Sequence, residues 1–369
     1  MGMNINNLTM RTGANNTTVH LTFSTPDEFN TCVSPEGLDW IIAYQPVYMW
    51  IVFVLGFIEN LFVILIFLLH RNRCTVAEIY LGNMAAADLI FVSGLPFWAI
   101  SISNKFYWPF GSFLCFTVNS LIQLNLFSSI YFLMMVSIDR YLALVKTMSF
   151  GRMRGAGCAK VNCVIIWVFA IVASLPKVVF RRVDFIPSIN TTACVILPPT
   201  DNWHIATNII MTIFGFLIPA IVIAFCTAQI IHALRNNTMQ QFKEINNEKK
   251  ATWLVLAVLL VFIICWLPFH IFTFIDTLDL YEVLPLCSLS MFTEIGNQIS
   301  TYIGYSNSCI NPLLYVIVGN HFRRKAKEVY WQLQSKIRPP RKASLPMSYS
   351  GVTVRTSISM GQQKIILKQ

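Results

Sequence analysis

Seven long apolar stretches constrain this chain more than any other feature. Each holds about 20 or more mostly apolar residues, enough for a helix to cross a hydrocarbon core of about 30 Å. A spanning segment must satisfy its own backbone hydrogen bonds, and the stretches lack the alternation of a membrane β-barrel, so we expect helices. The stretches lie near residues 44–69, 77–103, 114–138, 161–181, 204–234, 250–278 and 291–318. The predicted fold class is therefore an all-α membrane protein built on a seven-transmembrane helix bundle.

The composition also excludes an ordinary soluble domain. Hydrophobic residues make up 55% of the chain and charged residues 12%, against roughly 25% charged residues in typical soluble proteins. Residues 1–43 are polar and carry no short apolar core. We therefore expect no cleaved signal peptide, and we expect the first span to act as the insertion signal.

Basic residues set the predicted orientation. With the N-terminus outside, only five of the 27 Lys and Arg residues fall on the outer side, and an excess of positive charge marks the cytoplasmic side. We therefore expect a multi-pass protein of the plasma membrane with an extracellular N-terminus. Four Asn-x-Ser/Thr glycosylation acceptors then lie outside, and they are Asn7, Asn15, Asn16 and Asn190.

Acidic residues outnumber basic residues on the predicted outer side, although the formal net charge of the whole chain is +10. Because the topology explains most of the positive charge, we expect no nucleic-acid partner. An acidic outer mouth would draw cationic ligands toward it. The alternative is a solvated acidic rim that has no partner.

The chain divides into four predicted parts. They are an extracellular glycosylated N-terminal segment (1–43), the bundle (44–318), an amphipathic cytoplasmic helix at the membrane interface (319–333) and a disordered cytoplasmic tail (334–369). The interfacial helix is predicted because an apolar face lies opposite a face of bases. Its apolar face comprises Phe322, Ala326, Val329 and Tyr330. The tail is predicted to be disordered because it has few residues that could build a core.

Four of the ten cysteines lie on the predicted outer side, where disulfides can form: Cys32, Cys115, Cys194 and Cys287. Three pairings of these four are open from the sequence. A Cys115–Cys194 bond would tie the loop after the fourth span across the bundle mouth. Cys32–Cys287 would then join the N-terminal segment to the last outer loop. The remaining cysteines have no metal-ligand spacing.

Several polar residues lie within the spans, where they are costly and often functional. Asp88 is in the middle of the second span, and neutral oxygens occur at similar depth in other spans. One carboxylate among neutral oxygens suits a small hard cation or a water cluster. The alternative is a hydrogen-bond network that only holds helices together. The neutral residues are Asn60, Asn125, Ser129, Asn307, Ser308 and Asn311.

Charges and prolines indicate a conformational switch. Asp139-Arg140-Tyr141 ends the third span on the cytoplasmic side, and an ionised pair at a membrane boundary is costly unless it has a function. Prolines lie within three of the late spans, where each removes a backbone hydrogen bond and permits a kink. They are Pro219, Pro268 and Pro312, and Trp266 lies just before the second of them. A kinked helix with a bulky aromatic beneath an outer cavity can have two packings.

Together these residues resemble the rhodopsin-like (class A) G-protein-coupled receptors over about residues 40–332. The matching positions are Asn60, Leu81, Asp88, Cys115 with Cys194, Asp139-Arg140-Tyr141, Trp167, Pro219, Phe262, Trp266, Pro268 and Asn311-Pro312 with Tyr315. Thr227 departs from the pattern, because the family usually has a tyrosine there. The departure removes one half of the usual water-bridged tyrosine pair.

Longer runs at 74–83, 94–100, 137–148 and 355–359 resemble the bradykinin (kinin) receptors, type 2 most closely. The resemblance implies a receptor for a short cationic peptide with an arginine at each end. Asp276 and Glu294 would receive the N-terminal arginine, and Arg181 the C-terminal carboxylate. The full set of implied ligand contacts is Trp98, Gln123, Arg181, Phe269, Thr273, Asp276, Glu294, Gln298 and Tyr305.

One of these contacts departs from the kinin-receptor pattern. Gln123 stands where type 2 has a serine and type 1 a lysine. A preference for the intact peptide or for the form without its last arginine stays open, although the neutral glutamine favours the intact peptide.

The resemblance also implies the partners and the switch. Signalling would run through a Gq-class G protein, phospholipase C and calcium release, with Arg140 and Met148 contacting the G protein. The switch residues would be Asp139, Arg140, Tyr141, Ile130, Pro219, Phe262, Trp266, Pro268, Pro312 and Tyr315. A sodium ion at Asp88, Asn125, Ser129, Asn307 and Asn311 would favour the resting state, and no other cofactor is expected.

A receptor kinase and arrestin are the further partners that the resemblance implies. Phosphorylation of tail hydroxyls would recruit arrestin. The candidate sites are Ser344, Ser348, Ser350, Thr353, Thr356, Ser357 and Ser359.

Three alternatives remain. Within the receptor class, the ligand could be an angiotensin-like peptide or a chemokine. A transporter or channel would need a continuous polar path, yet polar residues thin out toward the layer at Phe262. An intramembrane enzyme would need a nucleophile–base pair or a metal cluster, and none of the six histidines has such a setting. We therefore expect no enzymatic activity.

Overall fold

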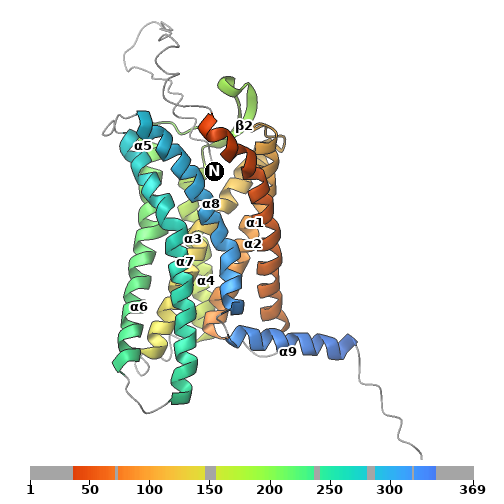
Figure 1. The fold of residues 1–369 in the computed structure, drawn as a ribbon, viewed down its shortest axis with the longest axis vertical. Helices are drawn as coiled ribbons and strands as arrows, with labels where there is room; N and C mark the ends of the chain where they lie inside the picture. Colours follow the sequence, from red (N-terminus) through yellow and green to blue (C-terminus); the bar gives the residue numbers. More distant parts are fainter. Residues whose placement is uncertain are drawn as a thin grey trace, which may run out of the picture. The chain divides into compact units, whose positions relative to one another are not determined.

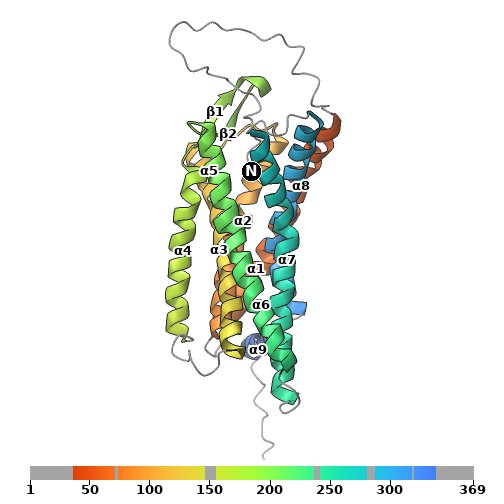
Figure 2. The ribbon, with the colours of Figure 1, turned by 90° about the vertical axis from the view of Figure 1, so that its left-hand side faces the viewer.

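The computed structural model describes residues 36–70, 74–145, 155–236, 242–280, 287–317 and 320–337. Its helices run side by side in a bundle (Figures 1 and 2). The bundle helices are α1 (Glu36–Leu69), α2 (Val76–Ser103), α3 (Gly111–Leu144), α4 (Ala156–Val178), α5 (Asp201–Thr212), α6 (Ile218–Asn236), α7 (Phe242–Leu280) and α8 (Cys287–Ile317). A π-helical segment, Ile213–Leu217, joins α5 to α6, so that together they make the fifth span.

The predicted seven-helix bundle is confirmed. Among the described residues, six segments are long and apolar enough to cross a membrane, one of them formed by α5 and α6 together. The seventh is α8, which packs against α1, α2 and α7. Several helices run past the predicted spans; α7, for example, begins at Phe242 rather than near residue 250.

A β-hairpin that the sequence analysis did not predict follows α4. Strands β1 (Arg181–Ile186) and β2 (Thr191–Ile196) pair antiparallel. The predicted fourth span reached residue 181, but α4 ends at Val178 and Arg181 opens β1. Asn190 takes the left-handed conformation needed at the turn (φ 47°), which asparagine tolerates better than most residues. We call the end of the bundle that carries β1 and β2 the hairpin end.

The hairpin is fastened to the bundle by a disulfide. Cys115 in the first turns of α3 is bonded to Cys194 in β2, with 5.7 Å between their Cα atoms, which confirms this predicted pairing. The backbone N–H of Trp108 also donates to the carbonyl of Thr192 (2.9 Å). The hairpin is therefore held across the bundle at two points.

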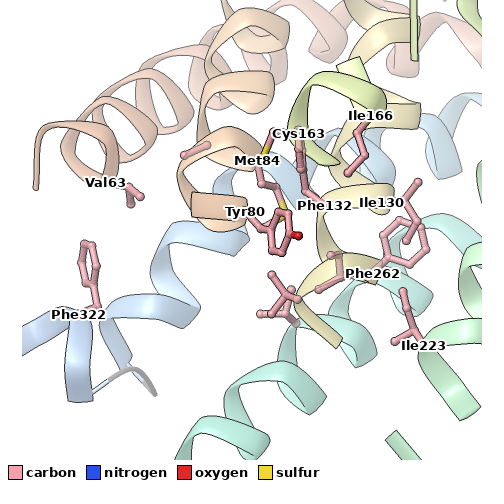
Figure 3. Close-up of a cluster of buried hydrophobic side chains, with 14 of the residues drawn as sticks. Val63, Tyr80, Met84, Ile130, Phe132, Cys163, Ile166, Ile223, Phe262 and Phe322 are labelled. Carbon is pink, nitrogen blue, oxygen red and sulfur yellow. The ribbon is translucent and has the colours of Figure 1, made fainter. Parts of the chain in front are cut away.

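An apolar core fills the bundle toward its other end. Figure 3 shows Ile130 of α3, Phe262 of α7 and Ile223 of α6 gathered in one layer. These side chains are almost fully buried. In contrast, α4 presents exposed apolar residues such as Ile165 and Ile171, as expected of a helix that faces lipid tails.

Helix α9 (Asn320–Ile337) follows the seventh span, and it begins at the end of the bundle opposite the hairpin (Figure 1), which we call the α9 end. Its residues up to Val329 belong to the same compact unit as the bundle. Phe322 and Val329 are buried there as predicted, whereas Tyr330 is exposed. The predicted amphipathic helix is confirmed, and one of its bases, Lys325, is also buried. An ion pair compensates for this burial.

That ion pair joins α9 to α2. The Lys325 ammonium donates to Glu78 Oε2 (2.8 Å), and both side chains are buried. Glu78 also accepts from the backbone N–H of Thr75 (2.7 Å) in a capping box that begins α2. A second pair joins His70 Nε2 to Glu328 Oε2 (2.8 Å). The Glu78–Lys325 ion pair and the contact between His70 and Glu328 therefore attach the first turns of α9 to the bundle.

Candidate functional site

A cavity of about 140 Å³ opens beneath the hairpin. Helices α2, α3, α4, α5, α7 and α8 contribute to its walls together with both strands. Its lining mixes charged, amide, hydroxyl and aromatic side chains, the combination typical of a ligand site. The lining residues are Phe91, Ile122, Gln123, Asn125, Leu126, Lys177, Arg181, Ile196, Asn208, Met211, Trp266, Phe269, Thr273, Asp276, Asn297, Gln298, Thr301 and Tyr305.

Opposite charges lie on different walls of this cavity. Arg181 comes from β1 and Lys177 from the last turn of α4, whereas Asp276 comes from α7. Arg181 is buried, and its Nη1 has no hydrogen-bond partner among the described residues. Burial lowers the pKa of Arg181 to about 10, against the opposing effect of the Tyr305 phenol. The guanidinium is therefore still charged at neutral pH.

Trp266 forms part of the cavity lining and connects it with the core. Its ring lies 6.5 Å from that of Phe262 and 5.8 Å from that of Phe269. Gly304 of α8 faces the indole so closely that an added Cβ would lie 3.0 Å from a ring carbon. A glycine is therefore needed for α8 to approach Trp266 as it does.

Pro219 of α6 is buried two residues after the end of the π-helical segment. Proline has no N–H to donate to the carbonyl of residue 215, and its ring would clash with that carbonyl in a regular α-helix. The wider π-helical turn relieves this conflict. The predicted irregularity at Pro219 is thus a local widening of the fifth span.

The polar residues around Asp88 converge in the middle of the bundle. Asp88 Oδ1 accepts from Asn125 Nδ2 (2.8 Å), Ser308 Oγ (2.9 Å) and Ser129 Oγ (3.2 Å). Its Oδ2 accepts from Asn311 Nδ2 (3.3 Å). The network therefore spans α2, α3 and α8.

Two buried amide oxygens of α8, one of them on the Asn311 side chain that bonds Asp88, bear on cation binding. The side-chain carbonyls of Asn307 and Asn311 are buried and have no hydrogen-bond partner among the described residues. A carboxylate with neighbouring carbonyl and hydroxyl oxygens is a donor set that hard cations prefer. The residues therefore fit the sodium ion that the sequence analysis expected.

Asp139 and Arg140 pair at the α9 end of α3. Arg140 Nη2 donates to Asp139 Oδ2 (2.7 Å), and the carboxylate is buried. The ring of Tyr141 lies 5.9 Å from that of Phe225 on α6. The ion pair lies within α3, and the contact between Tyr141 and Phe225 joins this end of α3 to α6.

Comparison with known proteins identifies the family. Residues 59–315 match the 7 transmembrane receptor (rhodopsin family). The chain belongs to the rhodopsin family of seven-transmembrane receptors. It is therefore a rhodopsin-like receptor and not an enzyme, and it is a multi-pass membrane protein.

Bradykinin receptors are among the most similar relatives of this receptor. The B2 bradykinin receptor of Homo sapiens is 53% identical over 334 residues, which cover 90% of this chain and 85% of the relative. That of Cavia porcellus is 52% identical over 339 residues, 90% of each chain. The B1 bradykinin receptor of Homo sapiens is 39% identical over 309 residues, 83% of this chain and 88% of the relative.

The structure brings most of the expected ligand contacts of the receptor together. Seven of them line the cavity: Gln123, Arg181, Phe269, Thr273, Asp276, Gln298 and Tyr305. Trp98 lies elsewhere, buried with its ring 5.3 Å from that of Trp108. The side chain of Glu294 lies outside the described part of the receptor.

Lys177 and Asn208 are cavity residues that the sequence analysis did not select. From the sequence, Lys177 is one of the five bases on the predicted outer side. A signal was present, because an ionisable residue inside an apolar stretch is a functional candidate by default. Asn208 carried no comparable signal, since a single amide near a span end is common.

Other expectations fall outside the described residues or side chains. These are Met148, Tyr315, Cys32, Cys287, Asn7, Asn15, Asn16 and the tail hydroxyls from Ser344 to Ser359. Asn190, in contrast, is described and is exposed at the hairpin turn.

Proposed function

We propose that the receptor binds a short cationic peptide of the kinin type. Two observations support this. The relatives that share about half of their residues with this chain are B2 bradykinin receptors. The cavity also presents Asp276 on one wall and Arg181 on another, and a peptide with an arginine at one end and a carboxylate at the other needs both signs of charge.

The charge arrangement orients the peptide. Its N-terminal arginine and amine bind Asp276 and Glu294, and its C-terminal carboxylate binds the fork of Arg181. Phe269 and Tyr305 give the apolar residues between the two ends an aromatic surface. Gln123 and Thr273 supply neutral hydrogen-bonding groups.

The hairpin end faces outward in this proposal, and the receptor lies in the plasma membrane. This orientation places few bases on the outer side, as the distribution of positive charge requires. It also places Asn190 where its exposed side chain can be glycosylated, together with Asn7, Asn15 and Asn16. The test compares a variant that keeps Asn190 but lacks the other three acceptors with the same variant carrying N190Q. A glycosidase should lower the apparent mass of the first and leave that of the second unchanged; no change in the first would contradict the orientation.

Peptide binding would shift a two-state equilibrium. Contacts of the peptide on the hairpin side of Trp266 favour an outward swing of α7, during which Ile130, Pro219 and Phe262 repack. Arg140 is released from Asp139 and faces the G protein, and Met148 fills an apolar pocket of that partner. A change from mostly inactive to mostly active needs about 5 kcal/mol of differential binding, which two charged peptide ends and an aromatic anchor can supply.

A sodium ion would hold the resting state. Asp88, Asn125, Ser129, Asn307 and Asn311 would supply its oxygens, and the ion would neutralise the buried carboxylate. Peptide affinity should then fall when choline chloride is replaced by sodium chloride at constant ionic strength. Equal affinity in the two salts would rule the sodium site out.

Signalling would run through a Gq-class G protein, with phospholipase C and calcium release. Tail phosphorylation by a receptor kinase would recruit arrestin. Calcium release evoked by bradykinin-like peptides, and suppressed by a Gq inhibitor, tests the ligand class and the G protein together. A response to angiotensin-like peptides or chemokines in place of kinins would favour the competing ligands.

Removing the acidic subsite tests the binding mode. The double variant Asp276→Asn with Glu294→Gln should lose potency for the peptide by about 100-fold or more, because each charge-assisted contact contributes about 1.5–3 kcal/mol. Asp184→Asn is the matched control, since Asp184 lies on the hairpin and pairs with Arg182 (3.3 Å). Unchanged potency in the double variant, at equal surface expression, would refute the proposed site.

A further inference from the structure

Two cations lie on one wall of the cavity, although the proposed binding mode uses only one. Lys177 is in the last turn of α4, and Arg181 begins β1 four residues later. Both side chains line the cavity, and they are close enough to repel each other. A pair of like charges in a partly buried site lowers stability unless something compensates for it.

The surrounding residues compensate for Lys177 only weakly. Its Nζ lies 3.4 Å from Asn208 Oδ1 and 3.8 Å from Met211 Sδ, both longer than an ordinary charge-assisted hydrogen bond. Asp276 of α7 acts on it electrostatically from another wall. For Arg181, Nη1 stays buried without a hydrogen-bond partner among the described residues.

A purely structural explanation accounts for part of this arrangement. A lysine in the last turn of a helix interacts favourably with the helix dipole, and it can extend its ammonium toward water. Lys177 instead points into the cavity, toward Asn208 and Met211 of α5. The dipole also provides no partner for Arg181 Nη1, which is buried without a hydrogen-bond partner among the described residues. The geometry therefore favours an anion that both cations contact.

We propose that Lys177 and Arg181 together bind the C-terminal carboxylate of the peptide, which makes Lys177 a determinant of specificity for a free C-terminal acid. This inference rests on the proposed function and deepens it. The planar fork of Arg181 can hold both carboxylate oxygens, and the compact ammonium of Lys177 adds a second positive charge from the α4 side. A C-terminal amide is neutral and adds N–H donors that face two cations, so the site rejects it.

The pair is tested by measuring binding of two forms of one bradykinin-like peptide, with a C-terminal acid and with a C-terminal amide. The receptors are the wild type, K177M, K177R, R181Q and K160M. Methionine keeps most of the lysine's length without its charge. Lys160 is an exposed lysine on the same helix, so K160M is the matched control. Surface expression and the unfolding temperature of each variant show whether it is folded.

We expect K177M to weaken binding of the acid by roughly 10- to 100-fold, the range for hydrogen bonds to charged groups, and to change binding of the amide by less than about 3-fold. R181Q should show the same selective loss. K177R should keep the preference for the acid, and K160M should match the wild type. If K177M proves unfolded, K177Q takes its place.

Two results would overturn the inference alone. The first is an unchanged affinity of K177M for the acid peptide. The second is an equal loss of affinity for the acid and the amide peptide in K177M, which would make Lys177 a structural residue. A wild-type receptor that binds neither peptide would instead refute the proposed function, and the inference would fall with it. A wild type that binds both forms equally would show that the pair does not contact the C-terminus.

Discussion

The two ends of the bundle hold buried charge in different ways. At the α9 end, the described buried charges lie against opposite charges, Glu78 with Lys325 at 2.8 Å and Asp139 with Arg140 at 2.7 Å. At the hairpin end, Lys177 and Arg181 lie near each other beside a cavity, and neither forms an ion pair among the described residues. Lysine and arginine side chains thus lie against carboxylates at the α9 end and beside a cavity at the hairpin end.

This difference separates charges that hold the structure from charges that await a ligand. A buried pair with good geometry recovers much of the cost of desolvation. Cations that are only weakly compensated beside a cavity keep part of that cost until an anion binds, and such perturbed groups cluster at functional sites. Removing a charge at the α9 end should therefore destabilise the receptor itself, whereas removing one at the hairpin end should mainly weaken ligand binding.

The largest expected effect is on the pair that joins α9 to α2. Lys325→Met leaves the Glu78 carboxylate buried without its cation, which should lower the free energy of unfolding by about 3–5 kcal/mol. Thermal unfolding of the purified receptor in detergent measures this loss.

A second variant separates the lost pair from lost packing. Glu78→Gln together with Lys325→Met removes both charges, and glutamine can still serve in the capping box with Thr75. The double variant should recover most of the stability. If Lys325→Met unfolds at the wild-type temperature, the α9 end does not depend on its paired charges.

A smaller effect is expected at Gly304, between the two ends. Gly304→Ala would place a methyl group 3.0 Å from the Trp266 ring, and such overpacking costs about 1–3 kcal/mol. Because Trp266 must shift, calcium release without peptide should also change. Gly157→Ala is the matched control, since an added Cβ there meets nothing within 4 Å. Identical stability and basal signalling in Gly304→Ala and the wild type would show that the contact is loose.

The smallest effect is expected for the second pair of α9. Glu328 is 42% exposed where it meets His70, and partly exposed ion pairs contribute about 1 kcal/mol or less. Glu328→Gln should therefore lower the unfolding temperature much less than Lys325→Met does. If Glu328→Gln lowers the unfolding temperature as much as Lys325→Met does, the contribution of a charge to stability at this end does not depend on how deeply it is buried.

The sequence was sufficient to predict the bundle but not the direction of particular side chains. The spans could be predicted because each holds its hydrophobic signal within about 20 consecutive residues. The hairpin was missed because two six-residue strands give little periodic signal. The Glu78–Lys325 pair joins residues 247 positions apart, and no local pattern reveals such a contact.

In the candidate site too, the sequence predicts some residues but not which way each side chain points. Asp276 and Arg181 could be predicted from the resemblance to kinin receptors. Lys177 carried only the general signal of an ionisable residue within an apolar stretch, because whether it points into the cavity depends on how α4 is rotated. Trp98 was expected at the cavity but lies against Trp108. A rotation of about one residue on a helix decides whether a side chain lines a cavity or packs behind it.

The most direct measurement is thermal unfolding of the wild type, R181Q and K325M, each with and without a saturating bradykinin-like peptide that has a free C-terminus. A ligand that binds only the folded state raises the unfolding temperature according to its affinity. We predict that unliganded R181Q unfolds at or above the wild-type temperature and loses most of the rise on adding peptide, whereas K325M starts lower and keeps the rise. An R181Q variant that is destabilised without peptide but keeps the full rise would contradict the account.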